Sequence, residues 1–475
     1  MAYYYLPFLP LRYSFLRGKA DKNTNNTAKS TDILASGLSS FLDKKSIEQL
    51  ARETGFVQRK SKLNAADLLN SLMFSHQQGK ELSLLDLCGD LYCQNNLLIK
   101  KQSIHERFNP EAVVFFKAVL SRLLERQFEM VVKDQVLSSF DRVRIKDSTR
   151  FALPDAYAST YKGHGGATHN SASMISIQYE YDVCSGNTMD LRLTTGVRND
   201  QRDAKENTHD IGKNDLFIRD LGYATMGYMM QIAENEAYFL NRLNPQVIAY
   251  HVEEPQKEVD FNKCHKKLKK YGLPYLEYQV TIGKKARIPC RLVIHRVDQS
   301  TYENRIRKTS KQAKSSGHQV SDGFKARAWL TAYVTNTTEA MIPASKIKQV
   351  YGLRWQIELT FKVWKSQGSI DKIKEMKICR FECQLIARLI WLLVHMKIYN
   401  SLTALINDQL PDDTLSIWKY YKHAYRINYL IREIITSSDK LFILLESLKL
   451  IAQNLFLLET KKGKKSHYQA IKSLT

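Results

Sequence analysis

The spacing of apolar residues changes along this chain, and the change limits the folds that the chain can adopt. From Ile33 to about Phe128, apolar residues recur every three or four positions, for example in "ADLLNSLMFSHQQ" and "PEAVVFFKAVLSRLLERQF", which predicts helices. Asn109 followed by Pro110 predicts the N-cap and first turn of one helix. Further on, "DRVRIKD", "ASMISIQYEYD" and "TMDLRLTTG" alternate apolar and polar residues, which predicts strands.

Strand and helix patterns then follow one another. A polar stretch is followed by the strand-like "DLFIRDLGY", the helical "ATMGYMMQIAEN" and the strand-like "AYFLNRL". Residues 244–328 carry strand-like pieces, "YLEYQVTI" and "CRLVIHRV", between basic runs, and we interpret them as an insertion. After the strand-like "WLTAYVTN" the chain is helical almost to its basic tail. This order predicts an α/β core with a mixed sheet, helices packed on it, and helical domains on both flanks.

Shifts in composition divide the chain into six predicted regions. The polar segment "DKNTNNTAKSTD" separates an N-terminal tail from the first folded residues. The regions are a tail and linker (1–32), a helical domain (33–135), the first part of the α/β core (136–243), a β-rich basic insertion (244–328), the second part of the core (329–372) and a helical C-terminal region with a candidate role in dimerisation (373–475).

The charge balance indicates a polyanionic partner. The chain has 71 Lys and Arg residues against 48 Asp and Glu residues, a formal net charge of +23. Nucleic acid is the first candidate and an anionic membrane surface the second. The longest apolar run, around Leu389 to Val394, is much shorter than the roughly 20 residues that a membrane-spanning helix needs. We therefore predict no membrane segment.

The cysteines predict free thiols. Seven cysteines are an odd number, and they are scattered through a large chain, so a disulfide framework is excluded and a cytoplasmic location is favoured. The close pairs are Cys88 with Cys93 and Cys379 with Cys383, and neither has further partners at the spacing of a zinc site.

The segment "YGLRWQIELTFKVWK" (351–365) has two opposed faces. On a helix with about 100° per residue, its apolar and its polar residues each fall within a sector of roughly 80°, almost diametrically opposite. The apolar residues are Leu353, Ile357, Phe361 and Trp364, and the polar ones are Tyr351, Arg354, Glu358, Lys362 and Lys365. The apolar face predicts a core contact. The polar face is either an exposed surface with i,i+4 ion pairs or a functional site.

Three carboxylates stand where a metal site could form. Asp147 ends the predicted strand "VRIKD" on its apolar face, Asp220 ends "LFIRD", and Glu358 is the one carboxylate of the polar helix face. Such carboxylates can hold a pair of Mg²⁺ ions, which prefer oxygen ligands. Alternatively, each Asp is a cap or turn residue. His164 and His169 lie in the glycine-rich "YKGHGGATHN", which favours an exposed loop over a metal site.

Taken together, these motifs resemble a known family. Tyr351, Arg354, Glu358 and Lys365 stand at the spacing of the Y-R-E-K signature of bacterial DDE transposases of the insertion-sequence-4 family. "KDSTRFALP" is similar to the segment of the family's first aspartate, and "DLGY" followed by "NEAYFLNRL" to that of its second. "WLTAYVTNT" lies upstream of the signature, as in the family. The resemblance covers the chain from about residue 33 to about residue 400.

The resemblance implies a ribonuclease-H-like core in which Asp147, Asp220 and Glu358 bind two Mg²⁺ (or Mn²⁺) ions. It also implies a set of DNA-binding residues at the transposon end. Those that would bind phosphates are Tyr351, Arg354 and Lys365, with Lys362 assisting, and Arg242 in "FLNRL". Trp329 is either the tryptophan that stacks on a flipped base in this family or a core residue.

The helical domain 33–135 resembles the family's module for recognising terminal inverted repeats. Within it, "KKQSIHERF" is either a recognition helix or an ordinary amphipathic helix. As a recognition helix it would place near the major groove Lys101, Gln102, Ser103 and Arg107.

The sequence therefore predicts a DNA transposase that works as a homodimer across two transposon ends, in the cytoplasm at the nucleoid. It would hydrolyse a DNA strand to free a 3′-hydroxyl and join that hydroxyl to target DNA. The resemblance implies cut-and-paste transposition through a hairpin. The alternatives are a metal-dependent nuclease of the same fold without strand transfer, and an inactive DNA-binding relic. Intact Asp147, Asp220 and Glu358 argue against the relic.

Overall fold

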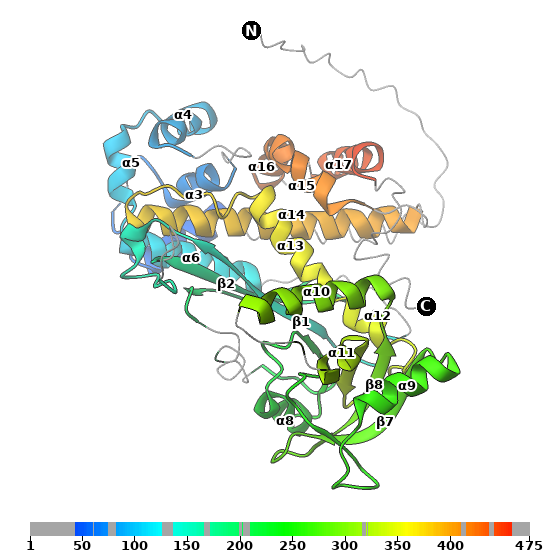
Figure 1. Ribbon diagram of the computed structural model, residues 1–475. Helices are drawn as coiled ribbons and strands as arrows, with labels where there is room; N and C mark the ends of the chain where they lie inside the picture. The colour runs from blue at the N-terminus through cyan, green and yellow to red at the C-terminus, as the bar shows by residue number, and fades with distance from the viewer. Residues whose placement is uncertain are drawn as a thin grey trace, which may run out of the picture.

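One sheet of nine strands runs through the computed structural model of this chain (Figure 1). The structure describes residues 43–59, 61–74, 82–125, 136–165, 172–198, 202, 210–315, 320, 322–409, 415–436 and 441–457. The strand order is β3-β2-β1-β4-β5-β9-β8-β7-β6. The strands are β1 (Val143–Ala152), β2 (Met174–Asp182), β3 (Thr188–Thr195), β4 (Leu216–Arg219), β5 (Tyr238–Arg242), β6 (Ala249–His251), β7 (Tyr275–Ile282), β8 (Ile288–Arg296) and β9 (Leu330–Thr335).

The predicted mixed sheet is confirmed. Strands β1, β2 and β3 pair antiparallel, whereas β1, β4 and β5 pair parallel. The remaining pairs, from β5–β9 to β7–β6, are antiparallel. Strand β9 follows the predicted insertion in the sequence and pairs with both β5 and β8. The strands of the insertion therefore extend the same sheet.

Outside the predicted insertion the helices lie where the three- and four-residue spacing predicts them, whereas the helices within residues 244–328 were not predicted. They are α2 (Lys44–Glu53), α3 (Ala65–Phe74), α4 (Leu84–Asn95), α5 (Lys101–Arg107), α6 (Pro110–Glu125), α8 (Met226–Glu234), α9 (Phe261–Tyr271), α10 (Gln299–Ser315), α11 (Asp322–Ala328), α12 (Ile347–Gly352), α13 (Trp355–Ser366), α14 (Ile378–Gln409), α15 (Ile417–Ala424), α16 (Asn428–Thr436) and α17 (Leu441–Leu455). The predicted N-cap is confirmed, because Asn109 Oδ1 accepts a hydrogen bond from the Ala112 N–H at 2.9 Å. The basic runs of the insertion form α9 and α10.

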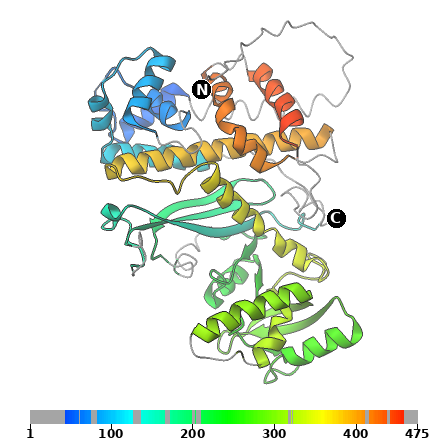
Figure 2. The same cartoon turned by 45° about the horizontal axis from the view of Figure 1, so that its top comes forward.

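Helix α14 is the axis of the helical part of the molecule. Figures 1 and 2 show α3 and α6 along one half of it and α15 and α17 along the other. Asn428 of α16 joins these groups, because its Nδ2 donates to the Phe74 carbonyl at the end of α3 and its Oδ1 accepts from Trp391 Nε1 of α14. The predicted N-terminal and C-terminal helical regions thus pack on each other. Within the described ranges, α14 included, no helix has both the length and the apolar character needed to span a membrane.

The sheet separates two hydrophobic cores. Leu216 and Ile218 of β4 face the core shared with the N- and C-terminal helices, whereas Phe217 faces the core beneath α8 and the insertion. Helix α13 packs on the first face, where the rings of Phe361 and Trp364 meet the Tyr179 ring of β2 at 6.2 and 4.8 Å. Because side chains alternate along a strand, the odd-numbered residues of β1 point toward α13.

Candidate active site

Asp147 lies in the middle of β1, not at its end as predicted. The strand continues to Ala152, because Thr149 and Phe151 resume the buried row that Asp147 interrupts. On one side Asp147 pairs with Tyr179 of β2. On the other side, the pairing of β1 with the shorter β4 stops at Lys146 and Arg219.

Asp220 is the residue that directly follows β4, as predicted. The register pairs Lys146 with Arg219, so the next residues on the two parallel strands, Asp147 and Asp220, lie side by side. The Asp220 carbonyl also accepts hydrogen bonds from the backbone N–H groups of Tyr223 and Ala224, which form a turn. Asp220 is therefore both a turn residue and the neighbour of Asp147.

The predicted single helix over residues 351–365 is wrong, because the segment contains two helices. Helix α12 ends at Gly352 and α13 begins at Trp355. Between them the backbone tightens to i→i−3 hydrogen bonds, from the N–H of Leu353 to the carbonyl of Val350 and from the N–H of Arg354 to that of Tyr351. Both intervening residues keep right-handed helical dihedrals, so the chain continues in nearly the same direction.

The apolar face of this segment is core, as predicted, but the polar face is only partly exposed. Leu353, Ile357, Phe361 and Trp364 are all buried. On the polar face Tyr351 and Arg354 are also buried, with 5% and 7% of their surface accessible, whereas Lys362 is exposed. The burial of Tyr351 and Arg354 excludes a fully solvated polar face.

Arg354 joins two of the three carboxylates. Its Nη2 donates to Glu358 Oε1 at 2.7 Å, and its Nη1 lies 3.4 Å from Asp147 Oδ2. Of the i,i+4 ion pairs weighed from the spacing, the one between Arg354 and Glu358 is therefore present. The same guanidinium also contacts Asp147 on β1, which lies 207 residues earlier in the sequence.

The electrostatics of Asp147 show that all three carboxylates are close together. The pKa of Asp147 is raised to about 6, chiefly by burial and in smaller part by the negative charges of Asp220 and Glu358. The Ser148 N–H and the Arg354 guanidinium lower the same pKa but do not cancel the rise. Asp147 therefore carries a negative charge that its surroundings only partly compensate.

The carboxylates do not form a ready metal cage. Among the residues that the structure describes, no group of three or more His, Cys, Asp and Glu side chains is placed to hold a metal ion. The Arg354 guanidinium lies between Asp147 and Glu358 instead. His164 is exposed, as predicted for a loop, and His169 lies outside the described residues.

The predicted phosphate ligands fall into two groups. Near the carboxylates, the Tyr351 ring lies 5.1 Å from that of Tyr333, and the positive charge of Arg242 acts on both tyrosines. Lys365 Nζ donates to the Arg150 carbonyl of β1 at 2.9 Å. Lys362 points elsewhere, with its Nζ 5.4 Å from the centre of the Trp418 ring.

The remaining DNA-binding predictions lie farther out in the fold. Trp329 stacks on Tyr302 at 4.0 Å, and the Arg296 guanidinium lies over its ring at 4.8 Å. A base would have to replace one of these partners, so the role of Trp329 stays a prediction. On α5 the side chains of Lys101, Gln102 and Ser103 are exposed, while Arg107 donates to Ser61.

Two residues near the site were missed from the sequence. Trp355 is 58% exposed, and the Arg354 guanidinium lies 5.7 Å from its ring. On the helical projection Trp355 lies about 40° from Tyr351, next to the polar sector, so its exposure could have been predicted from the sequence. Arg305 of α10 lies close enough to Arg242 and Tyr333 to interact with both, but its position in a basic run gave no signal.

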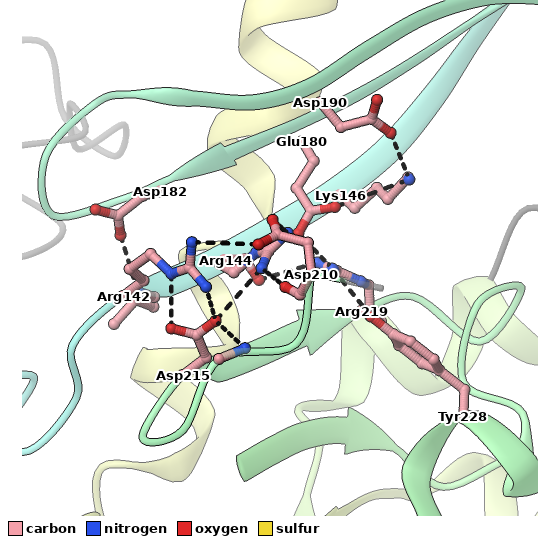
Figure 3. A network of polar contacts seen from close by, with 12 residues as sticks. Arg142, Arg144, Lys146, Glu180, Asp182, Asp190, Asp210, Asp215, Arg219 and Tyr228 are labelled. Carbon is pink, nitrogen blue, oxygen red and sulfur yellow. Dashed lines mark hydrogen bonds and ion pairs between the residues drawn. The ribbon is translucent and has the colours of Figure 1, made fainter. Parts of the chain in front are cut away.

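A buried network of charges supports the two aspartates from the opposite face of the sheet (Figure 3). Glu180 of β2 is its centre: its Oε1 accepts from Arg144 Nε of β1 and from Arg219 Nη2 of β4, both at 2.7 Å. Burial alone would raise the pKa of Glu180, but Arg219, Arg144 and Lys146 lower it well below its usual value. Lys146 and Arg219 directly precede the two aspartates, so the network fixes the strand positions that carry them.

Comparison with known proteins identifies the family. Residues 138–394 match the family described as transposase DDE domain. The transposase for insertion sequence element IS231F of Bacillus thuringiensis subsp. israelensis is 32% identical over 369 residues, which are 74% of this chain and 77% of the relative. The transposase for IS231D of Bacillus thuringiensis subsp. finitimus is 29% identical over 440 residues, 89% of both chains.

A more distant relative agrees. The transposase for IS1151 of Clostridium perfringens is 27% identical over 387 residues, which are 77% of this chain and 80% of the relative. The match to the DDE domain spans more than half of the chain and includes Asp147, Asp220 and Glu358. The chain therefore belongs to the DDE transposases of insertion sequences, as the Y-R-E-K signature predicts.

Proposed function

We propose that Asp147, Asp220 and Glu358 are the metal-binding catalytic residues of this transposase, and that they cut and rejoin DNA at the ends of its own element. One observation carries the proposal: two aspartates lie side by side on parallel strands, and Glu358 reaches the same guanidinium as Asp147. The order β3-β2-β1-β4-β5, with β1, β4 and β5 parallel, supports a ribonuclease-H-like core.

The donor chemistry suits a divalent metal, on which DDE transposases depend. Asp147, Asp220 and Glu358 offer the carboxylate oxygens that Mg²⁺ or Mn²⁺ prefers, and the raised pKa of Asp147 marks a negative charge that a cation would compensate. We expect these residues to hold two ions. When bound, the ions supply charge stabilisation for the attacking and leaving oxygens of a phosphoryl displacement.

The other side chains of the site would bind and orient the DNA. Arg354 pairs with Asp147 and Glu358, and Lys365 donates to a backbone carbonyl on the strand that carries Asp147. The positive charge of Arg242 acts on Tyr351, whose hydroxyl lies next to Arg354. Arginine and lysine bind phosphate oxygens, while Tyr can donate a hydrogen bond or stack. The ring of Trp355, which follows Arg354 in the chain, is exposed, and this supports access of a large ligand to this end of α13.

The transferred strand at each end undergoes two chemical steps, hydrolysis and joining, that need no external energy source. Water attacks a phosphorus at the transposon end, and the bond to the 3′-oxygen breaks, which leaves a 3′-hydroxyl. This hydroxyl then attacks a phosphorus of target DNA and displaces another 3′-oxygen, so one phosphodiester replaces another. We propose that a homodimer holds two ends together and that the element moves by cut-and-paste.

The test is cleavage of a supercoiled plasmid carrying the DNA that flanks this gene. Wild-type protein should cut it at discrete positions when Mg²⁺ is present, and Glu358→Gln should bind the same DNA without cutting it. Glu375→Gln makes the same chemical change at an exposed position, and it should cut like the wild type.

Other outcomes separate the alternatives. Discrete cutting by the wild type without any joining to target DNA would point to a nuclease. Binding without cutting by the folded wild-type protein would point to an inactive relic. Cutting that persists in Glu358→Gln would overturn the metal assignment.

A further inference from the structure

The Arg354 guanidinium occupies the space that the metal ligands share. It is hydrogen-bonded to Glu358 at 2.7 Å and paired with Asp147 at 3.4 Å, and its charge also interacts with Asp220. Its side chain is only 9% exposed. Each carboxylate oxygen that accepts a hydrogen bond from this cation has one fewer lone pair available for a metal ion.

The contacts of Arg354 are incomplete, in contrast to those of the neighbouring buried arginine. Its buried Nε finds no hydrogen-bond acceptor among the described residues. Arg219, on the opposite face of the sheet, donates from both terminal nitrogens to the Arg144 carbonyl and to Glu180 (Figure 3). The Arg354 guanidinium therefore retains a donor for a further ligand, and leaving its present position gives up two ion pairs and its place beside the Tyr351 ring.

Two aromatic rings lie beside this position, and one of them is exposed. The guanidinium lies 6.0 Å from the Tyr351 ring and 5.7 Å from the Trp355 ring, and Trp355 is 58% exposed. Arg354 stands at the N-cap of α13, where the side chain can swing toward Trp355 while the helix stays in place. A phosphate group arriving from that side offers a bidentate acceptor that two separate carboxylates do not.

We propose that Arg354 is an exchangeable counter-cation. Without DNA it neutralises Asp147 and Glu358 and keeps a metal ion from them. When DNA binds, its guanidinium moves to a phosphate, and the freed carboxylates bind the metal. This inference rests on the proposed function, because it takes Asp147, Asp220 and Glu358 as the metal ligands.

The exchange makes DNA binding and metal binding mutually dependent. If DNA strengthens metal binding by some factor, metal must strengthen DNA binding by the same factor. Removing the guanidinium should abolish the competition, so a variant should bind metal more tightly than the wild type in the absence of DNA. A gain of affinity cannot result from misfolding.

The experiment measures Mn²⁺ binding by electron paramagnetic resonance of the free ion, with full-length protein, with and without a duplex that contains the end of the element. We expect DNA to tighten Mn²⁺ binding to the wild type by about tenfold. Arg354→Gln should bind Mn²⁺ about tenfold more tightly than the wild type without DNA, and DNA should then change little. Arg354→Lys keeps the charge but loses the bidentate geometry, so it should fall between the two.

Lys348→Ala is the matched control, because it removes one exposed cation from α12, close to Arg354 in the sequence. It should bind Mn²⁺ like the wild type. Unchanged or weaker Mn²⁺ binding in DNA-free Arg354→Gln would overturn the exchange. If Mn²⁺ binding to Arg354→Gln is insensitive to a second substitution, Asp147→Asn, the metal assignment itself fails and the proposed function with it.

Discussion

At the scale of single residues, Arg354 and Lys365 are two cations of one signature with different surroundings. Arg354 pairs with carboxylates, whereas Lys365 donates to the backbone carbonyl of Arg150. Burial lowers the pKa of the Lys365 amine. A single hydrogen bond to a carbonyl leaves two of its three N–H donors for a phosphate.

Lys365→Ala should therefore weaken binding to the transposon end and reduce its dependence on salt. If Lys365 contacts one phosphate, the slope of log affinity against log salt should fall by about one counterion. Binding isotherms at several salt concentrations measure this slope. Lys365→Arg should preserve most of it, and an unchanged slope in Lys365→Ala would show that Lys365 only supports β1.

A second residue-scale prediction concerns His395 of α14. Its ring nitrogens lie 2.9 Å from the Tyr420 hydroxyl and 3.1 Å from Asn428 Oδ1, and burial lowers its pKa to about 3. In the unfolded chain the His395 imidazole is protonated near its ordinary pKa of about 6.5, whereas in the folded chain it stays neutral to a much lower pH. The stability contributed by neutral His395 is therefore complete above pH 6.5 and is lost as the pH falls toward 3.

The wild type should lose about 1 kcal/mol more per pH unit in this window than His395→Gln, whose side chain does not titrate. Urea denaturation at pH 7, 6, 5 and 4 measures the difference between the two proteins. The comparison cancels other groups that titrate in the same range. If the unfolding free energies of the two proteins change with pH in parallel, the lowered pKa of His395 is contradicted.

These residues also show what sequence reasoning can reach. The signature and the two strand patterns predict Asp147, Asp220 and Glu358 and the order of their elements. The length of β1 was missed because Asp147 interrupts the apolar row of Val143, Ile145, Thr149 and Phe151. The pair between Arg354 and Asp147 was not predictable either, because no local pattern links residues so far apart in the chain.

At the scale of elements, the strands β1, β2 and β4 are held together by buried charges around Glu180. Arg219 and Glu180 are almost completely buried, and desolvating such charges costs more than their attraction returns in many proteins. The network therefore adds little net stability but makes any other pairing of these strands costly. Its consequence is a fixed relation between Asp147 and Asp220.

Removing both partners of a buried ion pair should cost less than the two single removals added together. Glu180→Leu removes the carboxylate with which Arg219 pairs and one of those with which Arg144 pairs, and it should cost about 3–5 kcal/mol of unfolding free energy. The double variant Glu180→Leu/Arg219→Met should cost less than the sum of the two single changes. Chemical denaturation measures all three. Glu236→Gln breaks the exposed ion pair with Lys213 and should leave the midpoint unchanged.

The division of the signature segment into α12 and α13 could not be predicted from the sequence. The residues from Tyr351 to Arg354 are all compatible with a helix, and Gly352 only weakens it. The tight turn between α12 and α13 shows itself only in the i→i−3 hydrogen bonds of the folded chain. The nine-stranded sheet was predicted in its parts, but the pairing of β9 with both β5 and β8 depends on contacts between distant segments.

At the scale of the whole molecule, the N-terminal and C-terminal helices form one body around α14. The contacts include Asn428 with the Phe74 carbonyl, Arg432 with Asp90, and Arg380 with the Leu82 carbonyl. The predicted boundary between a DNA-end-binding domain and the rest of the chain therefore does not separate two bodies in space. The helices on its N-terminal side pack directly on the C-terminal helices.

A chain that starts at residue 136 should consequently not fold stably. It would expose the side of α14 that packs on α3 and α6, and we expect aggregation or a broad thermal transition by circular dichroism. A chain that starts at residue 43 keeps these helices and should melt in one sharp transition. Equal melting of the two chains would show that the N-terminal helices fold independently.

The central position of α14 also sets the timing of folding during synthesis. About 250 residues separate the end of α6 from the start of α14. At about 5–20 residues per second, roughly 10–50 s pass between the emergence of the two helices from the ribosome. Throughout this interval the apolar sides of α3 and α6 that pack on α14 stay uncovered. The nascent transposase therefore presents an aggregation-prone surface until most of the polypeptide has been made.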